Sequence, residues 1–277
     1  MFKNVFFFLF THFSVGLVFT ILMISRQEIG KLFFRVTTLL ASGLIVVALA
    51  AKPFGAIDWS YLFHPAPEAD TLWPQLSYWF LVITAFLLLV YNVVSTGFHK
   101  FLLAASFLTG LAGISCFSLV TYRPAGAAFA HQGLFVTNGI TATLLLGSVL
   151  GAMITGHWYL VQHKLSLTPL KNSTRVYLLS VFSRTGIVVA SLLLTWNVDL
   201  DTSPSQLLTG LSFNSFVFFL RIGFGLIIPL IFGLLICSAV TIRSTQSATG
   251  MLYATIVLIL IGETFARFLY FSVGIPL

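Results

Sequence analysis

The sequence contains 277 residues, of which 58% are hydrophobic and 8% charged, with seven acidic side chains against fourteen Lys and Arg. So few charges cannot cover the water-facing surface of a soluble fold of this length, whereas a bilayer requires apolar cover. A nucleic-acid partner is also excluded, because the positive residues lie between apolar runs and form no basic stripe.

Eight apolar runs reach the length of roughly 20 residues that a membrane-spanning helix requires. In chain order they cover residues 5–24, 32–51, 74–96, 101–120, 133–160, 176–196, 212–239 and 248–271. A transmembrane β-barrel would instead show short segments of alternating polarity. We therefore predict an all-α fold, a polytopic transmembrane bundle of eight helices with residues 1–277 in a single domain. Pro229 lies inside the seventh run and predicts a kink there.

The positive residues between the runs predict the orientation, because Lys and Arg near short loops resist export. Loops on one side contain Arg26, Lys31, Arg35, Lys100, Lys164, Lys171, Arg175 and Arg243, and those on the other contain Lys3, Lys52 and Arg123. Both termini are therefore predicted to face outward. Residues 52–73, rich in Pro and aromatic residues, are predicted to form an outer surface loop.

Ionised side chains inside apolar runs cost on the order of 2.5–3.5 kcal/mol each on insertion scales, so those that remain are candidates for function. Glu263 and Arg267 are four positions apart and can pair on one helical face. His12 and Arg221 lie at a similar outer-half depth in their own runs. Together these residues offer a titratable imidazole, a carboxylate and fixed positive charges, as proton-coupled chemistry on a buried quinone requires. The alternative is structural, with a self-satisfied ion pair and a carbonyl partner for His12.

A second polar set is predicted near the inner face. The fifth run closes with His157 and Tyr159, and Arg184 lies near the same side of the sixth run. An interfacial aromatic belt explains Tyr159, whereas His157 is a candidate to line an inner water cavity or to ligate a metal together with His99. We group His157, Tyr159 and Arg184 as a secondary inner-side polar cluster and expect no metal site.

The six histidines raise the question of haem b. Axial ligation between two helices needs paired histidines at matching depths. His12 with His131 and His99 with His157 match by depth, but His99 and His131 lie at the ends of helices, where solvation explains them. No run contains the two well-separated histidines that stacked haems need, and we do not expect haem b.

Two segments carry a family likeness. Residues 262–270 read Gly-Glu-Thr-Phe-Ala-Arg-Phe-Leu-Tyr, which resembles the Gly-Glu-x-x-x-Arg-x-x-Tyr/Phe ending of the membrane-anchor subunits of dimethyl sulfoxide reductase and their quinol-oxidising relatives. Residues 10–16, Phe-Thr-His-Phe-Ser-Val-Gly, are similar to the start of the first helix in those subunits. Eight helices with outward termini also match.

The resemblance implies a bundle that exchanges electrons between a membrane quinone, menaquinone or ubiquinone, and an iron–sulfur or multihaem cytochrome partner. It carries over Glu263, Arg267 and Tyr270 as motif positions. The chain departs from the family, which has a functional acid and histidine on its early helices. Its third run offers Tyr78, Tyr91 and Asn92 but no acid. Either quinone is held differently here, or this member only anchors its partner.

The leading prediction is thus a quinone-binding membrane subunit of a respiratory electron-transfer complex, in the inner membrane of a prokaryote and surrounded by lipid. Its largest expected part in an enzymatic reaction is that of the quinone-binding subunit of an oxidoreductase complex. The quinone-binding and proton-transfer residues would be His12, Arg221, Glu263, Arg267 and Tyr270. Two alternatives remain, a purely structural membrane anchor and a transporter of ions or small solutes. A transporter would normally show broken helices, inverted repeats and several membrane acids, and Glu263 is the one deep carboxylate in this sequence.

Overall fold

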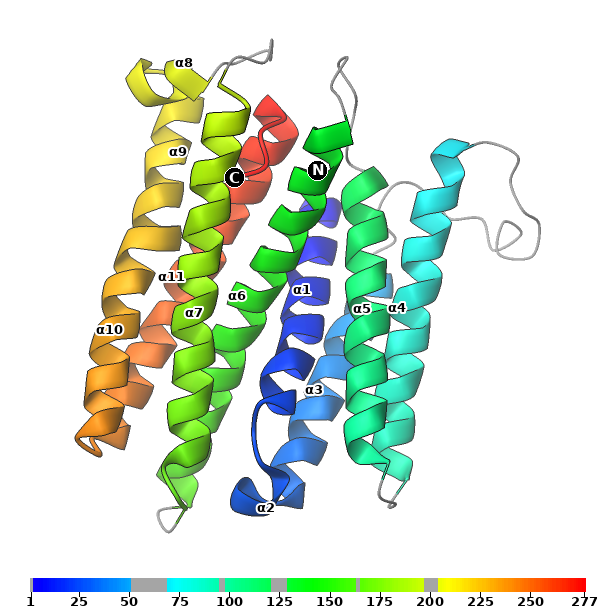
Figure 1. The fold of residues 1–277 in the computed structure, drawn as a ribbon, viewed down its shortest axis with the longest axis vertical. Helices are drawn as coiled ribbons and strands as arrows, with labels where there is room; N and C mark the ends of the chain where they lie inside the picture. The colour runs from blue at the N-terminus through cyan, green and yellow to red at the C-terminus, as the bar shows by residue number, and fades with distance from the viewer. Residues whose placement is uncertain (1, 51–68, 95–97, 121–128, 163–164, 197–203) are drawn as a thin grey trace. The chain divides into compact units, whose positions relative to one another are not determined.

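A computed structural model describes residues 2–50, 69–94, 98–120, 129–162, 165–196 and 204–277 (Figure 1). Every regular element in these ranges is a helix, which confirms the all-α prediction. The chain divides into two compact units, Met1–Thr143 and Leu144–Leu277. Helix α6 (Phe129–Val161) contributes its first part to unit 1 and its second part to unit 2.

Unit 1 contains α1 (Phe2–Leu22), the short α2 (Arg26–Ile29), α3 (Lys31–Ala50), α4 (Ala69–Val93) and α5 (His99–Val120), besides the start of α6. Helix α1 packs against α3 and α5, and α4 packs along α5. Hydroxyl groups donate across these contacts to backbone carbonyls: Ser14 to Ala41 at 2.7 Å and Ser77 to Gly113 at 2.8 Å. Such bonds join helices in lipid, where apolar contact alone gives little driving force.

Unit 2 contains the rest of α6, then α7 (Thr168–Leu194), α8 (Pro204–Thr209), α9 (Phe213–Ile222), the π-helical turn η2 (Gly223–Ile227), α10 (Ile228–Thr241) and α11 (Thr245–Val273). The segments α9, η2 and α10 follow one another as a continuous helical run (Figure 1). Helix α11 packs against all three of them, and α10 packs against α7. Unit 2 is therefore held together by the contacts of α11 with the preceding helical run and by those of α10 with α7.

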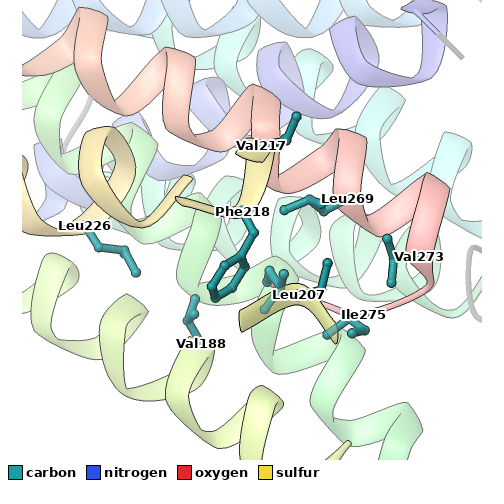
Figure 2. Packing of buried hydrophobic residues seen from close by; sticks show 9 residues of the cluster. Val188, Leu207, Val217, Phe218, Leu226, Leu269, Val273 and Ile275 are labelled. Carbon is teal, nitrogen blue, oxygen red and sulfur yellow. The ribbon is translucent and has the colours of Figure 1, made fainter. Parts of the chain in front are cut away.

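An apolar cluster lies at the end of unit 2 where α11 terminates. It consists of Val188, Leu207, Val217, Phe218, Leu226, Leu269, Val273, Ile275 and Leu277. Figure 2 shows the side chains of Val188, Leu207 and Phe218 pointing toward one another. Gly274 follows α11 with φ of 79°, in the left-handed region where glycine is unstrained, and thereby turns the chain. Residues 275–277 are consequently buried in unit 2 rather than continuing the helix.

Eight helical segments in the described ranges are long and apolar enough to cross a membrane. They are Asn4–Leu22, Lys31–Ala50, Trp73–Val93, His99–Leu119, Gln132–Val161, Thr168–Leu194, Phe213–Thr241 and Thr245–Val273. The eight predicted runs are confirmed, and the chain has the character of an integral membrane protein. The outward orientation of the termini and the single domain stay predictions. Most of the predicted outer loop, residues 52–68, lies outside the described residues, and residues 69–73 belong to α4.

The seventh span contains one π-helical turn, η2, directly before α10, and Pro229 is in the first turn of α10. The kink predicted at Pro229 stays a prediction. A proline lacks the N–H that an α-helix needs four residues after a carbonyl, and a π-turn adjusts the bonding locally. The phenol of Tyr177 on α7 donates to the carbonyl of Pro229 at 2.6 Å and so joins α7 to this part of the span.

Candidate functional site

The carboxylate of Glu263 on α11 is the centre of a charged cluster inside unit 2. Arg184 on α7 binds it in bidentate fashion, with Nε 3.0 Å from Oε1 and Nη2 3.0 Å from Oε2. Arg221 on α9 donates from Nη2 to Oε1 at 2.8 Å. Bidentate guanidinium–carboxylate pairing is among the strongest polar contacts in proteins. One acidic side chain therefore joins three helices, α7, α9 and α11.

Arg267 completes what we call the Glu263 cluster: Glu263, Arg184, Arg221 and Arg267. Its Nη2 lies 3.9 Å from Oε2 of Glu263, one helical turn earlier on α11. The predicted pair on one helical face is thus present, but it is the longest of the ion pairs within the cluster. Nη2 of Arg184 also donates to the carbonyl oxygen of Leu277 at 2.9 Å, which connects the cluster to the buried residues after α11.

The Glu263 cluster is closed to solvent and lipid. Glu263, Arg184 and Arg221 have no exposed surface and Arg267 is 3% exposed. Three guanidinium groups and one carboxylate give the cluster a formal charge of +2. Removing one partner from a buried ion pair is strongly destabilising, because the other charge is left unpaired in a low-dielectric interior. Glu263 therefore compensates the positive charges of three arginines at once, and its loss would remove that compensation from all of them.

Two glycines let Arg221 reach Glu263. Gly262 on α11 lies against Gly225 in η2 so closely that a Cβ built on Gly262 would be 2.6 Å from the Gly225 backbone nitrogen. A Cβ on Gly225 would in turn overlap Nη1 of Arg221. Nη1 and Nε of Arg221 have no hydrogen-bond partner within the described part of the chain. Backbone contact between α11 and η2 is thus a condition for the cluster, and π-turns often mark functional positions.

The structure corrects the predicted position of Arg184. The sequence pattern grouped it with His157 and Tyr159, but its guanidinium binds Glu263 and so belongs with the residues of the first predicted set. The reason is the start of its helix. Helix α7 begins at Thr168 instead of residue 176, so Arg184 lies 16 residues into the helix and not about eight. At 1.5 Å per residue it is roughly 24 Å from the start of the helix.

Two other residues predicted for quinone binding lie outside these ion pairs. His12 belongs to unit 1, is 1% exposed, and its Nδ1 is 2.7 Å from the carbonyl oxygen of Phe8 on the same helix. The carbonyl partner anticipated by the structural alternative is therefore present. Tyr270 is 7% exposed on α11, one turn after Arg267, and its ring lies edge-on to Phe271. The assignment of these side chains to quinone stays a prediction.

The inner-side residues form a different arrangement from the predicted one. The hydroxyl of Tyr159 donates to the carbonyl of Ser166, beyond the end of α6, which gives Tyr159 a local structural role. His157 is exposed, and its Nδ1 lies 2.7 Å from the hydroxyl oxygen of Tyr253 on α11. Tyr253 was not predicted from the sequence, although a tyrosine near the start of the last run is at a depth similar to that of His157 near the end of the fifth.

No protein-family model matches the chain, and neither a curated protein nor a solved structure matches it. Function is therefore inferred from the residues, their geometry and the motif likeness of the first and last helices. In the described ranges, no three His, Cys, Asp or Glu side chains gather where they would hold a metal ion.

Proposed function

We propose that this chain is the membrane subunit of a respiratory electron-transfer complex, where it binds quinone or quinol and anchors an iron–sulfur or multihaem cytochrome partner. The bundle belongs in the inner membrane of a prokaryote. In this role the chain conducts no substrate chemistry and supplies only the quinone-binding part of an oxidoreductase complex.

The observation that carries this proposal is the placement of the Gly-Glu-x-x-x-Arg-x-x-Tyr motif. Its members Gly262, Glu263, Arg267 and Tyr270 are all buried, and the carboxylate is held by arginines from two other helices. These two ion pairs make the motif part of the framework that joins α7, α9 and α11. The resemblance to quinol-oxidising anchor subunits is thereby supported by an arrangement that organises unit 2.

A second candidate, a purely structural membrane anchor, is favoured by the complete burial of the Glu263 carboxylate. A group that exchanges protons with a diffusible lipid needs access to it, and this carboxylate accepts three guanidinium hydrogen bonds with no exposed surface. The two candidates agree that the Glu263 cluster holds the helices together. They differ in whether the assembled complex responds to quinol.

Arg267→Gln is the variant that separates them, because its contact with Glu263 is the longest in the cluster and its removal disturbs packing least. In a quinone-binding subunit we expect turnover with quinol to fall about tenfold per assembled complex, equivalent to about 1.4 kcal/mol in the barrier. The measurement is quinol oxidation by the complex purified from native membranes, normalised to the amount of complex. A structural anchor would give reduced yield with unchanged turnover per complex. Wild-type complex that contains no quinone and is indifferent to quinol would refute the proposal.

A further inference from the structure

Helices α6 and α11 are joined by a hydrogen bond between two exposed, titratable side chains. Within the membrane-spanning helices that the structure describes, this is the one such pair. The two side chains are His157 and Tyr253, with Nδ1 and the hydroxyl oxygen 2.7 Å apart. Tyr253 is 42% exposed and His157 is exposed as well. Both lie within membrane-spanning segments, so this exposed surface is available to molecules in the bilayer. Glu263 lies ten residues, or roughly 15 Å, further along α11. Its cluster is buried and has no comparable surface exposed to the bilayer.

A glycine brings the two side chains together. A Cβ built on Gly156 would be 2.8 Å from Oγ1 of Thr249, which is fully buried. Thr249 lies one turn before Tyr253 on α11, and Gly156 directly precedes His157. The absence of a side chain at Gly156 thus allows α6 to approach α11 closely just beside the pair. The backbone fixes the position of this polar pair, which does not depend on a flexible loop.

The pair can serve as either donor or acceptor toward a ligand. When the tyrosine hydroxyl donates to Nδ1, the neutral imidazole carries its proton on Nε2 and offers a donor. When Nδ1 donates to the tyrosine oxygen, Nε2 becomes an acceptor and the phenolic proton is free to donate. A quinone carbonyl requires a donor and a quinol hydroxyl requires an acceptor. The same two side chains therefore match both redox states of one head group without a change of charge.

Exposed aliphatic side chains lie one turn from the pair on both helices. Val161, one turn after His157, is 67% exposed, and Val257, one turn after Tyr253, is 54% exposed. A polar spot bordered by exposed aliphatic side chains on membrane-spanning helices fits a ligand with a small polar head and a hydrocarbon tail. A head group that hydrogen-bonds through oxygen and a tail that stays in lipid are the two features of an isoprenoid quinone.

We propose that His157 and Tyr253 bind the head group of a quinone or quinol that arrives from the bilayer. This inference depends on the proposed function, because it names the contact site for the lipid that the complex is proposed to use. It also assigns different roles to the two polar regions of unit 2. The His157–Tyr253 pair, the quinone pair, contacts the ligand, and the Glu263 cluster holds α11, which carries Tyr253, in the position that turnover requires.

The test is quinone binding to the full-length chain in lipid nanodiscs, with a short-chain ubiquinone and a short-chain naphthoquinone as probes. Tyr253→Phe removes one oxygen and keeps the ring, and we expect it to weaken binding about fivefold to tenfold. His157→Phe removes both ring nitrogens and is expected to weaken binding more than tenfold. Tyr78→Phe is the matched control, because it removes the same atom from unit 1, where the hydroxyl donates to the carbonyl of Leu49. Its affinity for the probes should equal that of the wild type.

A photoreactive quinone provides an independent readout. We expect it to label the peptides around His157 and Tyr253, and this labelling should fall in both variants. The assignment of the quinone pair would be overturned if both variants bound the probes with the affinity of the wild type, or if labelling were confined to other helices. Either result would leave the proposed function standing. Absence of quinone binding to the wild-type chain and to its native complex would overturn both.

Discussion

Gly262→Ala is expected to separate α11 from η2 and to disrupt unit 2. The new methyl group would overlap the backbone of Gly225, with the added Cβ 2.6 Å from the Gly225 nitrogen. A backbone cannot turn away from this overlap as a flexible side chain can. Overpacking of a well-packed interior typically costs about 1–3 kcal/mol and occasionally more. Here the displacement also lengthens the contact between Arg221 and Glu263, so we expect a loss at the upper end of that range. The measurement is unfolding of the purified chain by SDS in mixed micelles.

Gly250→Ala is the matched control for this substitution. Gly250 lies on the same helix, α11, but a Cβ at this position meets nothing within 4 Å. Because alanine is the better helix former, we expect this variant to be as stable as the wild type or slightly more stable. Equal stability of Gly262→Ala and Gly250→Ala would show that α11 and η2 do not touch as described.

Glu263→Gln is expected to destabilise the chain by about 3–5 kcal/mol, the usual cost of breaking a buried ion pair by removing one partner. The amide retains the shape of the carboxylate, so packing is preserved. What is lost is the negative charge that compensates Arg184, Arg221 and Arg267 in an interior without exposed surface. The variant should give a lower yield of folded protein and unfold at a lower SDS fraction than the wild type.

Glu28→Gln provides the corresponding control. It makes the same chemical change in α2, outside the membrane-spanning segments, where the side chain is only partly buried. We expect a change of within about 0.5 kcal/mol there, as for most surface substitutions. If Glu263→Gln were equally mild, the carboxylate would not be the charge that holds the three helices.

The eight spans could be predicted from sequence because each apolar run exceeds the length that a bilayer requires. The start of α7 could not. Residues 168–175, Thr-Pro-Leu-Lys-Asn-Ser-Thr-Arg, are too polar to be read as part of a span. In the structure Ser173 and Thr174 donate their hydroxyl groups to the carbonyl of Leu170 within the same helix, which makes the polar first two turns compatible with a helix. This difference alone displaced Arg184 from its predicted depth.

The composition of the Glu263 cluster was predictable only in part. Spacing of four residues is sufficient to expect that Glu263 and Arg267 share a face. Spacing gives no information on how α7 and α9 are rotated about their own axes, and that rotation decides whether Arg184 and Arg221 point toward α11. The shorter contacts to Glu263 come from these two residues, so the stronger part of the cluster depends on packing between distant helices.

Glycines and single tyrosines carried little signal for a related reason. Gly262 was visible as part of the motif, but Gly225 is one of 21 glycines in the chain, and only the packing of α11 on η2 distinguishes it. Tyr253 likewise becomes informative once its hydroxyl is found beside His157. Contacts between helices give these residues their roles, and a pattern along one helix does not contain such contacts.

A double-mutant cycle between Arg184 and Glu263 tests most directly whether this carboxylate joins α7 to α11. Arg184→Gln, Glu263→Gln and the double variant are compared with the wild type by SDS unfolding. If the bidentate pair exists, each single variant leaves an uncompensated partner. The double variant should then be more stable than the sum of the single losses predicts, by about 2–3 kcal/mol. Losses that add to within about 0.5 kcal/mol, as for independent sites, would contradict the structure of the cluster.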